Sequence, residues 1–274
     1  MFLRTRIAPL TAWLLFASLA TVYRPQLPVG QFCGGLNFVE GFAGSGNLGK
    51  AVAQLDNWNV AQHDMLNGID MLAPNYASLM ESGMRDGLVT ALSLATECTT
   101  FSRANTKHPY RNRQYPKGLP TLGLTQRQKA EVGNQLLQLS LRLFWFALSV
   151  GTLVFIENSS LSRLWDDPNI QPLIVEANRT EADPNPRVVL IKLHYCMYGR
   201  RFKKPTTILA AFKPRSAAQY GSLKMLKRRL QTRCAHKHHR TILQFGATKR
   251  LGNPYPPKLC NRWGACIDDL CRCK

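Results

Sequence analysis

Short apolar runs alternate with amphipathic stretches along most of the chain, and this alternation limits the folds that the sequence can adopt. Five runs have the pattern of buried strands: 36–42, 58–64, 87–95, 152–158 and 187–199. The stretches with the pattern of helices are 47–57, 76–84 and 125–151. Strands that alternate with helices predict an α/β fold, in which a mostly parallel sheet carries helices on both faces.

The residues with useful chemistry follow the predicted strands directly. They lie in the segments VEGFAGSGNLG, HDMLNGID, TECTTFS, IENSS and YCMYGRRFKKP. The carboxyl ends of parallel strands meet at one edge of a sheet, where ligands bind. The sequence therefore predicts one site at that edge. Cys98 lies there, which is the reason to consider it a nucleophile and not a buried structural thiol.

A glycine-rich turn at residues 40–49 follows the first strand and opens a helix. Gly44 and Gly46 allow the backbone to approach a ligand closely, and the start of a helix favours a polar or anionic group. The spacing of a P-loop is absent, which argues against an ATPase. Asp64 ends the second strand, where nucleotide-binding sheets place a partner for ribose hydroxyls. We therefore expect a cofactor that contains adenosine.

The charge of the chain is strongly positive and unevenly distributed. There are 36 Lys and Arg against 16 Asp and Glu, a formal net charge of +20. From Arg200 onward there are 19 basic residues and 2 acidic ones. Such an excess indicates a polyanionic partner, with nucleic acid favoured over an acidic lipid surface. Residues 210–250 are the expected basic nucleic-acid-binding segment.

The eight cysteines are scattered and include no Cys-x-x-Cys pair. They do not resemble the disulfide framework of a small secreted protein. The run CAHKHH at 234–239 and the tail CIDDLCRCK contain metal-ligating residue types, but neither has a strong zinc spacing. We predict no metal site, and we expect Cys33, Cys196 and Cys234 to be structural thiols.

The N-terminal segment 1–30 has a separate character. Arg4 and Arg6 precede an apolar stretch over residues 7–22. This pattern is typical of a secretory or organelle-targeting leader, and the stretch is short for a membrane span. We expect a removable or dispensable segment and no stable span. The compartment depends on this segment: an organelle or the secretory route if it is a leader, and the nucleus if it is not.

Taken in order, these motifs resemble the DNA cytosine-5 methyltransferase family over roughly residues 36–266. FVEGFAGSGNLG is similar to the family's cofactor loop, ECTTFS to its Pro-Cys-x-x-Phe-Ser nucleophile motif, and FIENSS to its Glu-Asn motif. YCMYGRRFKKPT and LGNPYPPKLCNRWGACI are similar to its later arginine-containing and Gly-Asn motifs. The resemblance implies a Rossmann-like S-adenosylmethionine-dependent methyltransferase sheet. Its short basic insertion, in place of a large target-recognition domain, is most similar to divergent methyltransferase-like proteins of mobile elements.

The resemblance implies methylation of carbon 5 of cytosine in DNA through a covalent Cys98 adduct. A thiolate that adds to carbon 6 makes carbon 5 nucleophilic. Glu157, as a carboxylic acid of raised pKa, would deliver a proton to ring nitrogen 3, and Asn158 would orient Glu157 or the base. Arg200 or Arg201 would hold the base carbonyl or a phosphate. The target base would have to leave the duplex.

The resemblance also implies where S-adenosylmethionine binds. The predicted cofactor-binding residues are Glu40, Phe42, Gly44, Gly46, Asp64, Asp70 and Asn253. Asp70 would meet the adenine amino group, and Asn253 would close the pocket. Residues 31–209 would then form the methyltransferase core, and residues 251–274 would complete the cofactor site.

Glu97 departs from the family pattern, because proline precedes the nucleophile there. Two like charges about 4 Å apart repel by up to about 4 kcal/mol at an effective dielectric near 20. Even a third of that raises the pKa of the Cys98 thiol by roughly one unit. We expect Arg103 and the pair Arg200–Arg201 to compensate.

Two alternatives to DNA methylation stay open. One is a catalytically silent relative that binds nucleic acid, and the other is an RNA cytosine methyltransferase. In all three cases the short basic segment 206–250 predicts weak sequence specificity and strongly salt-dependent binding.

Overall fold

The computed structural model describes residues 35–103, 107–179, 183, 186–213, 222–239 and 254–272. The predicted leader 1–30, Cys33 and Asn253 lie outside these residues. Within the described part of the chain, no helix has the length and apolar character needed to cross a membrane.

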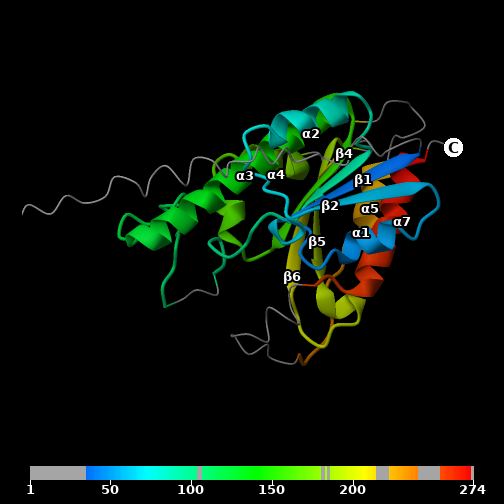
Figure 1. Ribbon diagram of the computed structural model, residues 1–274. Helices are drawn as coiled ribbons and strands as arrows, with labels where there is room; N and C mark the ends of the chain where they lie inside the picture. Colours follow the sequence, from blue (N-terminus) through cyan, green and yellow to red (C-terminus); the bar gives the residue numbers. More distant parts are fainter. Residues whose placement is uncertain are drawn as a thin grey trace, which may run out of the picture.

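A six-stranded sheet forms the middle of the molecule (Figure 1). Its strands are β1 (Leu36–Gly41), β2 (Trp58–His63), β3 (Ala91–Leu94), β4 (Leu153–Ser159), β5 (Val188–His194) and β6 (Pro205–Ala211). Their order is β2-β1-β3-β4-β6-β5. The first four strands pair in parallel, whereas β6 runs antiparallel to both β4 and β5. The predicted α/β, Rossmann-like sheet is confirmed, and β6 is a strand that the sequence patterns did not indicate.

Helices cover both faces of this sheet (Figure 1). One face carries α2 (Tyr76–Arg85), α3 (Leu124–Val150) and α4 (Gln171–Arg179). The other carries α1 (Asn47–Val52), α5 (Ser222–Leu230) and α7 (Pro257–Cys271). Three short 3-10 helices follow strands: η2 (Met65–Asn67), η3 (Arg163–Asp166) and η4 (Tyr195–Tyr198). The molecule is therefore a three-layer α/β/α sandwich.

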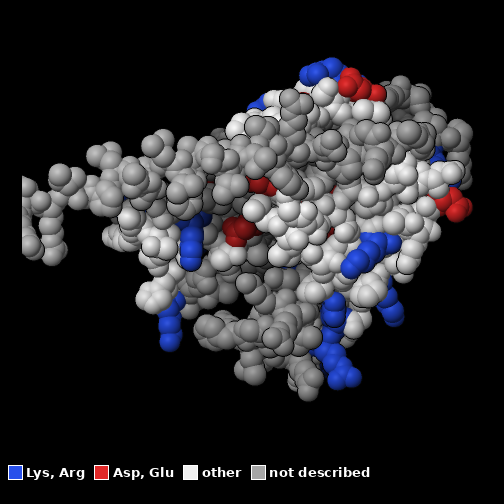
Figure 2. Space-filling model, in the orientation of Figure 1, with Lys and Arg blue, Asp and Glu red and all other residues white. Residues whose placement is uncertain are grey.

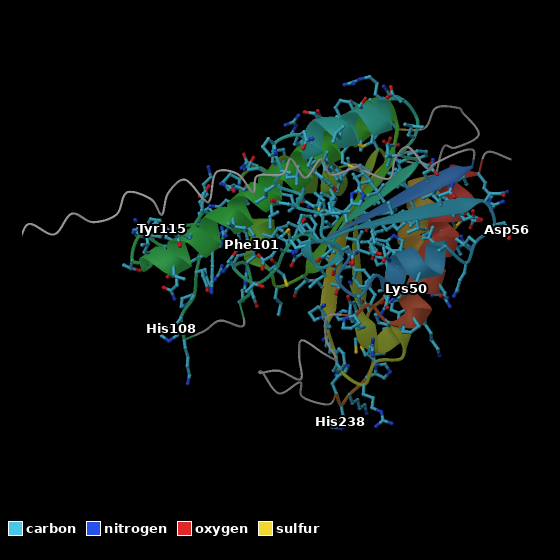
Figure 3. The ribbon with its side chains drawn as sticks, viewed as in Figure 1. Lys50, Asp56, Phe101, His108, Tyr115 and His238 are labelled. Atoms are coloured by element: carbon cyan, nitrogen blue, oxygen red, sulfur yellow. The ribbon has the colours of Figure 1, made fainter. Side chains whose placement is uncertain are left out.

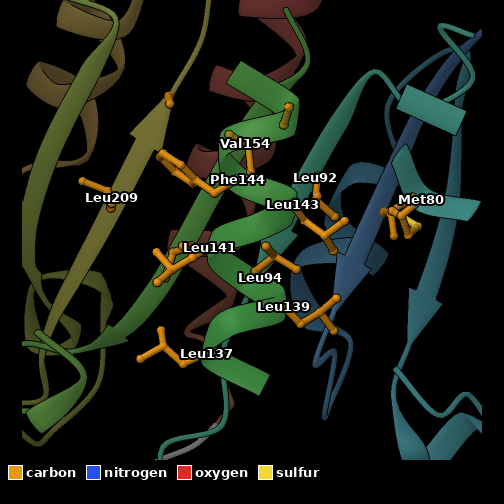
Figure 4. Packing of buried hydrophobic residues seen from close by; sticks show 14 of the residues in the cluster. Met80, Leu92, Leu94, Leu137, Leu139, Leu141, Leu143, Phe144, Val154 and Leu209 are labelled. Atoms are coloured by element: carbon orange, nitrogen blue, oxygen red, sulfur yellow. The ribbon is translucent and has the colours of Figure 1, made fainter. Parts of the chain in front are cut away.

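Each face of the sheet has its own apolar core, because side chains of a strand point alternately to the two faces. In β4, Val154 and Ile156 belong to the core under α3, whereas Leu153 and Phe155 belong to the core under α7. Figure 4 shows the first of these cores, with the leucines of α3 against residues of the strands. Each fully buried side chain of this kind stabilises the fold by about 1.5–3 kcal/mol.

The C-terminal helix α7 returns the chain to the beginning of the sheet. It packs beside α1, and its fully buried Trp263 meets Phe155 edge to face at a centroid distance of 5.4 Å. The indole nitrogen of Trp58 donates to Asp268 Oδ1 at 2.7 Å. Helix α7 therefore joins the C-terminal end of the described chain to β2 and β4.

Candidate active site

A cavity of about 1190 Å³ opens where β1, β2, β3 and β4 end. It is lined by the loops that follow these strands and by the start of β6. Of the predicted site residues, it brings together Phe42, Gly44, Asp64, Asp70, Cys98, Glu157 and Asn158. The strands thus deliver to one place residues that are more than a hundred positions apart in sequence.

Cys98 lies in the loop after β3 and is exposed within the cavity. Desolvation raises the pKa of its thiol, and the carboxyl groups of Glu97 and Glu157 raise it further. Lys204 acts in the opposite direction and lowers it. The thiolate form of Cys98 therefore depends on Lys204 to offset two neighbouring acids.

Asn158 holds the nucleophile loop from the neighbouring strand. Its amide nitrogen donates to the carbonyl oxygen of Thr96 at 2.8 Å, and its Oδ1 accepts from the backbone nitrogen of Ser159 at 2.9 Å. The hydroxyl of Thr96 donates to Ser140 of α3 at 2.9 Å. We expected Asn158 to orient Glu157 or the base, whereas these bonds fix the turn that carries Cys98.

Arg111 holds the other side of the same loop, and nothing in the sequence patterns pointed to it. Its buried guanidinium donates to Thr100 O at 3.2 Å, to Thr100 Oγ1 at 2.8 Å and to Ala130 O of α3 at 2.8 Å. It also lies 3.8 Å from the centroid of the Phe101 ring. A Cβ at Gly133 would come within 2.5 Å of Thr100 Oγ1, so only glycine leaves room for this arrangement.

Glu97 turns one carboxylate oxygen to the backbone nitrogen of Thr99. Its other oxygen, Oε2, is buried and has no hydrogen-bond partner within the described residues. The expected compensation by Arg103 is wrong, because Arg103 pairs with Asp166 at 3.3 Å. Arg103 therefore does not form an ion pair with Glu97, the acid next to Cys98.

Glu157 is buried at the end of β4 and accepts a hydrogen bond from the hydroxyl of Tyr255 at 3.0 Å. Burial raises the pKa of this carboxyl, and Lys204 and the Tyr255 hydrogen bond lower it less strongly. A carboxyl group in such a setting holds its proton to higher pH than usual and is suited to donate it. Tyr255 precedes α7, so the C-terminal segment reaches the cavity.

The arginines predicted to hold the base or a phosphate do not line the cavity. Arg200 donates to the carbonyl oxygen of Pro254 at 3.2 Å, Arg201 is exposed, and neither lines the cavity. Lys203 and Lys204, further along the same run RRFKKP, line it instead. The run of four basic residues was the available signal, but it could not indicate which of them point inward.

Two predicted cofactor residues shape the glycine-rich turn and do not line the cavity. Glu40 is buried and accepts from the backbone nitrogen of Gly49 at 2.9 Å and from Gln62 Nε2 at 3.2 Å. Burial raises the pKa of Glu40 to about 7, against the opposing effect of these hydrogen bonds. Gly46 has a φ of 63° at the start of α1, and a Cβ there would collide with Gln62.

Asp64 ties the loops after β1 and β2 together. Its Oδ2 accepts from the backbone nitrogen of Gly44 at 3.0 Å, and its Oδ1 accepts from that of Leu66 at 2.9 Å. Met65 and Leu66 are 68% and 81% exposed beside it. Asp70 also lines the cavity, and its Oδ1 accepts a hydrogen bond from the backbone nitrogen of Leu72 at 2.9 Å.

The end of the predicted pocket is only partly described. Asn253 lies outside the described residues, but its neighbours Pro254 and Tyr255 line the cavity. The carbonyl oxygen of Tyr255 accepts from Asn47 Nδ2 of α1 at 3.2 Å. The segment before α7 therefore contacts both the glycine-rich turn and Glu157.

The basic segment 210–250 is described in part, over 210–213 and 222–239. Its helix α5 (Ser222–Leu230) carries Lys227, Arg228 and Arg229 in its last turn. Arg229 forms an ion pair with Asp269 of α7. Figure 2 shows the described Lys and Arg side chains spaced around one face and not merged into a single patch.

Comparison with known proteins gives a limited result. No family model and no curated protein matches the chain. Among solved structures, a methyltransferase of Entamoeba histolytica matches with a TM-score of 0.39 and 12% identity, over 66% of this chain and 54% of that one. A proposed DNA modification methyltransferase encoded within an E. coli prophage matches with a TM-score of 0.35 and 15% identity, over 65% and 47%. The chain thus spans about half the length of each of these two proteins.

Proposed function

We propose that the protein is an S-adenosylmethionine-dependent methyltransferase that modifies carbon 5 of cytosine in DNA. The observation that carries the proposal is the shared cavity of Cys98, Glu157 and the glycine-rich turn with Asp64. A nucleophile, a buried acid and a turn suited to a nucleoside lie on successive loops of one sheet edge. The reaction needs these three elements within one pocket.

In the proposed reaction Cys98 attacks the base. Its thiolate forms a bond to carbon 6, while Glu157 transfers its proton to ring nitrogen 3, so that the ring stays neutral and carbon 5 gains electron density. Lys204 offsets the negative charge near the thiolate. Carbon 5 would then form a bond to the methyl group that the cofactor supplies, as the methyl–sulfur bond breaks and the demethylated cofactor leaves. Loss of the carbon 5 proton to solvent would break the carbon–sulfur bond and expel the Cys98 thiolate, and return of the nitrogen 3 proton to Glu157 would restore both groups.

The residues of the turn fit the proposed cofactor, which when bound supplies an electrophilic methyl group. Gly44 has a φ of 52°, and a Cβ there would meet nothing closer than 4.0 Å, so its surface is open toward the cavity. Each oxygen of Asp64 accepts one backbone hydrogen bond and keeps a lone pair for a ribose hydroxyl. The exposed Met65 and Leu66 beside it would cover an adenine ring.

A second candidate function is favoured by Glu97. A carboxylate next to the nucleophile, without compensation from Arg103, opposes thiolate formation. A protein whose Cys98 cannot ionise would bind nucleic acid and transfer nothing. RNA as the substrate is a further outcome that the same experiment separates from DNA.

The test is transfer of a radiolabelled methyl group from S-adenosylmethionine to mixed-sequence DNA and to RNA by the full chain under reducing conditions. Label in DNA that disappears in Cys98→Ser and persists in Cys271→Ser, a cysteine of α7 outside the cavity, supports the proposal. Label in RNA alone identifies an RNA methyltransferase. Salt-sensitive binding of both polymers without any label would assign the protein to the silent class.

A further inference from the structure

We propose that Cys196, Cys234, His236 and His239 form a zinc site that fastens the segment after α5 to the end of β5. The ligand atoms of these four residues all lie within 4.8 Å of one another. Cys196 belongs to η4, and the other three belong to the run at 234–239. The sequence alone predicted no metal site, because the fourth ligand lies 38 residues before this run.

The distances within the cluster suit a tetrahedral ion. Zinc bonds of about 2.3 Å to sulfur and about 2.0–2.1 Å to nitrogen place neighbouring ligand atoms about 3.3–3.8 Å apart. Cys234 Sγ lies 3.5 Å from His236 Nδ1 and 3.0 Å from His239 Nε2. The rings of His236 and His239 stand almost perpendicular, at 85°, with centroids 5.7 Å apart. Small side-chain rotations would therefore complete the coordination shell.

The ligand set also favours zinc on chemical grounds. Two cysteines and two histidines are a common structural zinc set, and soft thiolates disfavour calcium and magnesium. Two thiolates balance the double charge of the ion, so the occupied site adds no charge beside Lys203 and Lys237. All four positions are taken by protein, which is typical of a structural site and leaves no open position for catalysis.

The position of the cluster indicates what the ion would stabilise. Hydrogen bonds hold the preceding residues to η4 and β5: Tyr198 Oη donates to Leu230 O at 2.7 Å, and the backbone nitrogen of Thr232 donates to Lys192 O at 3.1 Å. The cluster lies just beyond Thr232 and would fix the next seven residues. Lys203 and Lys204 follow η4 in the same loop, so the ion would join the basic segment to the cationic rim of the cavity.

The direct test is the metal content of the full chain, purified with a reducing agent and without chelator. We expect about one zinc ion per chain, as for a four-ligand structural site. Replacement by cobalt should give the absorption of a tetrahedral ion with thiolate ligands. Zinc-free protein after exposure to a zinc salt would overturn the proposal, as would a disulfide between Cys196 and Cys234 in the purified chain.

Variants locate the ion. Cys196→Ser and Cys234→Ser should each lose the zinc, whereas His238→Ala should keep it. His238 lies in the same run, at the lower edge of the molecule in Figure 3, but does not belong to the cluster. Cys271→Ser, which changes the last residue of α7, should also keep it. Unchanged zinc in Cys196→Ser would contradict the proposal.

A second readout does not depend on metal analysis. Chelation of the wild-type protein, or the variant His239→Ala, should speed tryptic cleavage after Arg233 and Lys237 several-fold, while cleavage within the sheet stays unchanged. The same comparison applies if the cysteine variants fail to fold. Equal cleavage with and without chelator would show that no ion holds the segment. Neither readout involves methyl transfer, so this proposal and the proposed function succeed or fail separately.

Discussion

The two halves of the cavity are built in different ways. The loops after β1 and β2 are fixed by acids of these two neighbouring strands, as Glu40 accepts from Gly49 and Asp64 accepts from Gly44 and Leu66. The loops after β3 and β4 are fixed by residues far away in the sequence. Asn158 donates a hydrogen bond to Thr96, and Tyr255 donates one to Glu157. The first half is thus a pre-shaped binding surface, whereas the second depends on the whole fold to align its reactive groups. Substitutions in the two halves should therefore affect different steps.

The largest expected effect is on the reactive half. Glu157→Gln should slow methyl transfer by about a hundredfold or more, because an amide cannot donate a proton as the carboxylic acid does. Binding of S-adenosylmethionine, measured by calorimetry, should change less than twofold. A Glu157→Gln protein with wild-type transfer rates would remove Glu157 from the proposed reaction.

On the binding half, Asp64→Asn should weaken S-adenosylmethionine binding by about tenfold, since a neutral amide is a poorer acceptor for ribose hydroxyls than a carboxylate. The rate at saturating cofactor should stay within a few-fold of wild type. Calorimetry and transfer kinetics measure this, with Asp56→Asn, an exposed acid outside the cavity, as the matched control. If the loss appears in the saturated rate and not in the affinity, the two halves are not separable as proposed.

Glu40 gives the binding half a pH-dependent stability. Its pKa is raised from 4.5 to about 7 by burial, so the folded chain holds a proton that the unfolded chain has lost. Stability from this group is therefore full below about pH 4.5 and is lost as the pH rises to about 7. In Glu40→Gln this change, on the order of 1–3 kcal/mol, should disappear from urea unfolding curves between pH 5 and pH 8. An unchanged pH profile in the variant would contradict the assignment.

The smallest expected effect concerns the acid beside the nucleophile. Glu97→Gln removes one of the charges that raise the pKa of Cys98, so the rise of activity with pH should shift to lower pH. At neutral pH the rate should increase several-fold, because a larger fraction of the thiol is ionised. The pH–rate profile beside that of Arg103→Gln, whose charge is engaged by Asp166, measures this. A shift in the opposite direction would show that Glu97 assists the reaction.

The same division explains what the sequence could predict. The strand ends and the residues directly after them follow from local periodicity, so Gly44, Asp64, Cys98 and Glu157 could be named in advance as one cluster. The residues that complete the cavity depend on tertiary packing. No local pattern distinguishes Lys204 from the basic residues just before it, and of these Arg200 and Arg201 do not line the cavity.

The roles of Arg111 and Cys196 also depend on tertiary packing and follow from no local sequence pattern. Arg111 occurs in a polar loop rich in basic residues, and only packing against Thr100 and α3 makes it a buried clamp. None of the other three residues of the cluster lies near Cys196 in the sequence. They come from the segment after α5, which lies beside η4 only in the folded chain. The roles of Arg111 and Cys196 are set by partners far away in the chain, so no pattern of neighbouring residues indicates them.

The central claim is that Cys98 forms a covalent bond to cytosine, and a mechanism-based substrate tests it most directly. DNA that carries 5-fluorocytosine cannot lose a proton from carbon 5 after methyl transfer, so the enzyme should stay attached to it. We predict a complex that survives denaturing electrophoresis, requires S-adenosylmethionine, and yields a modified peptide that contains Cys98. DNA that binds with ordinary salt dependence but is never attached to Cys98 would contradict the account.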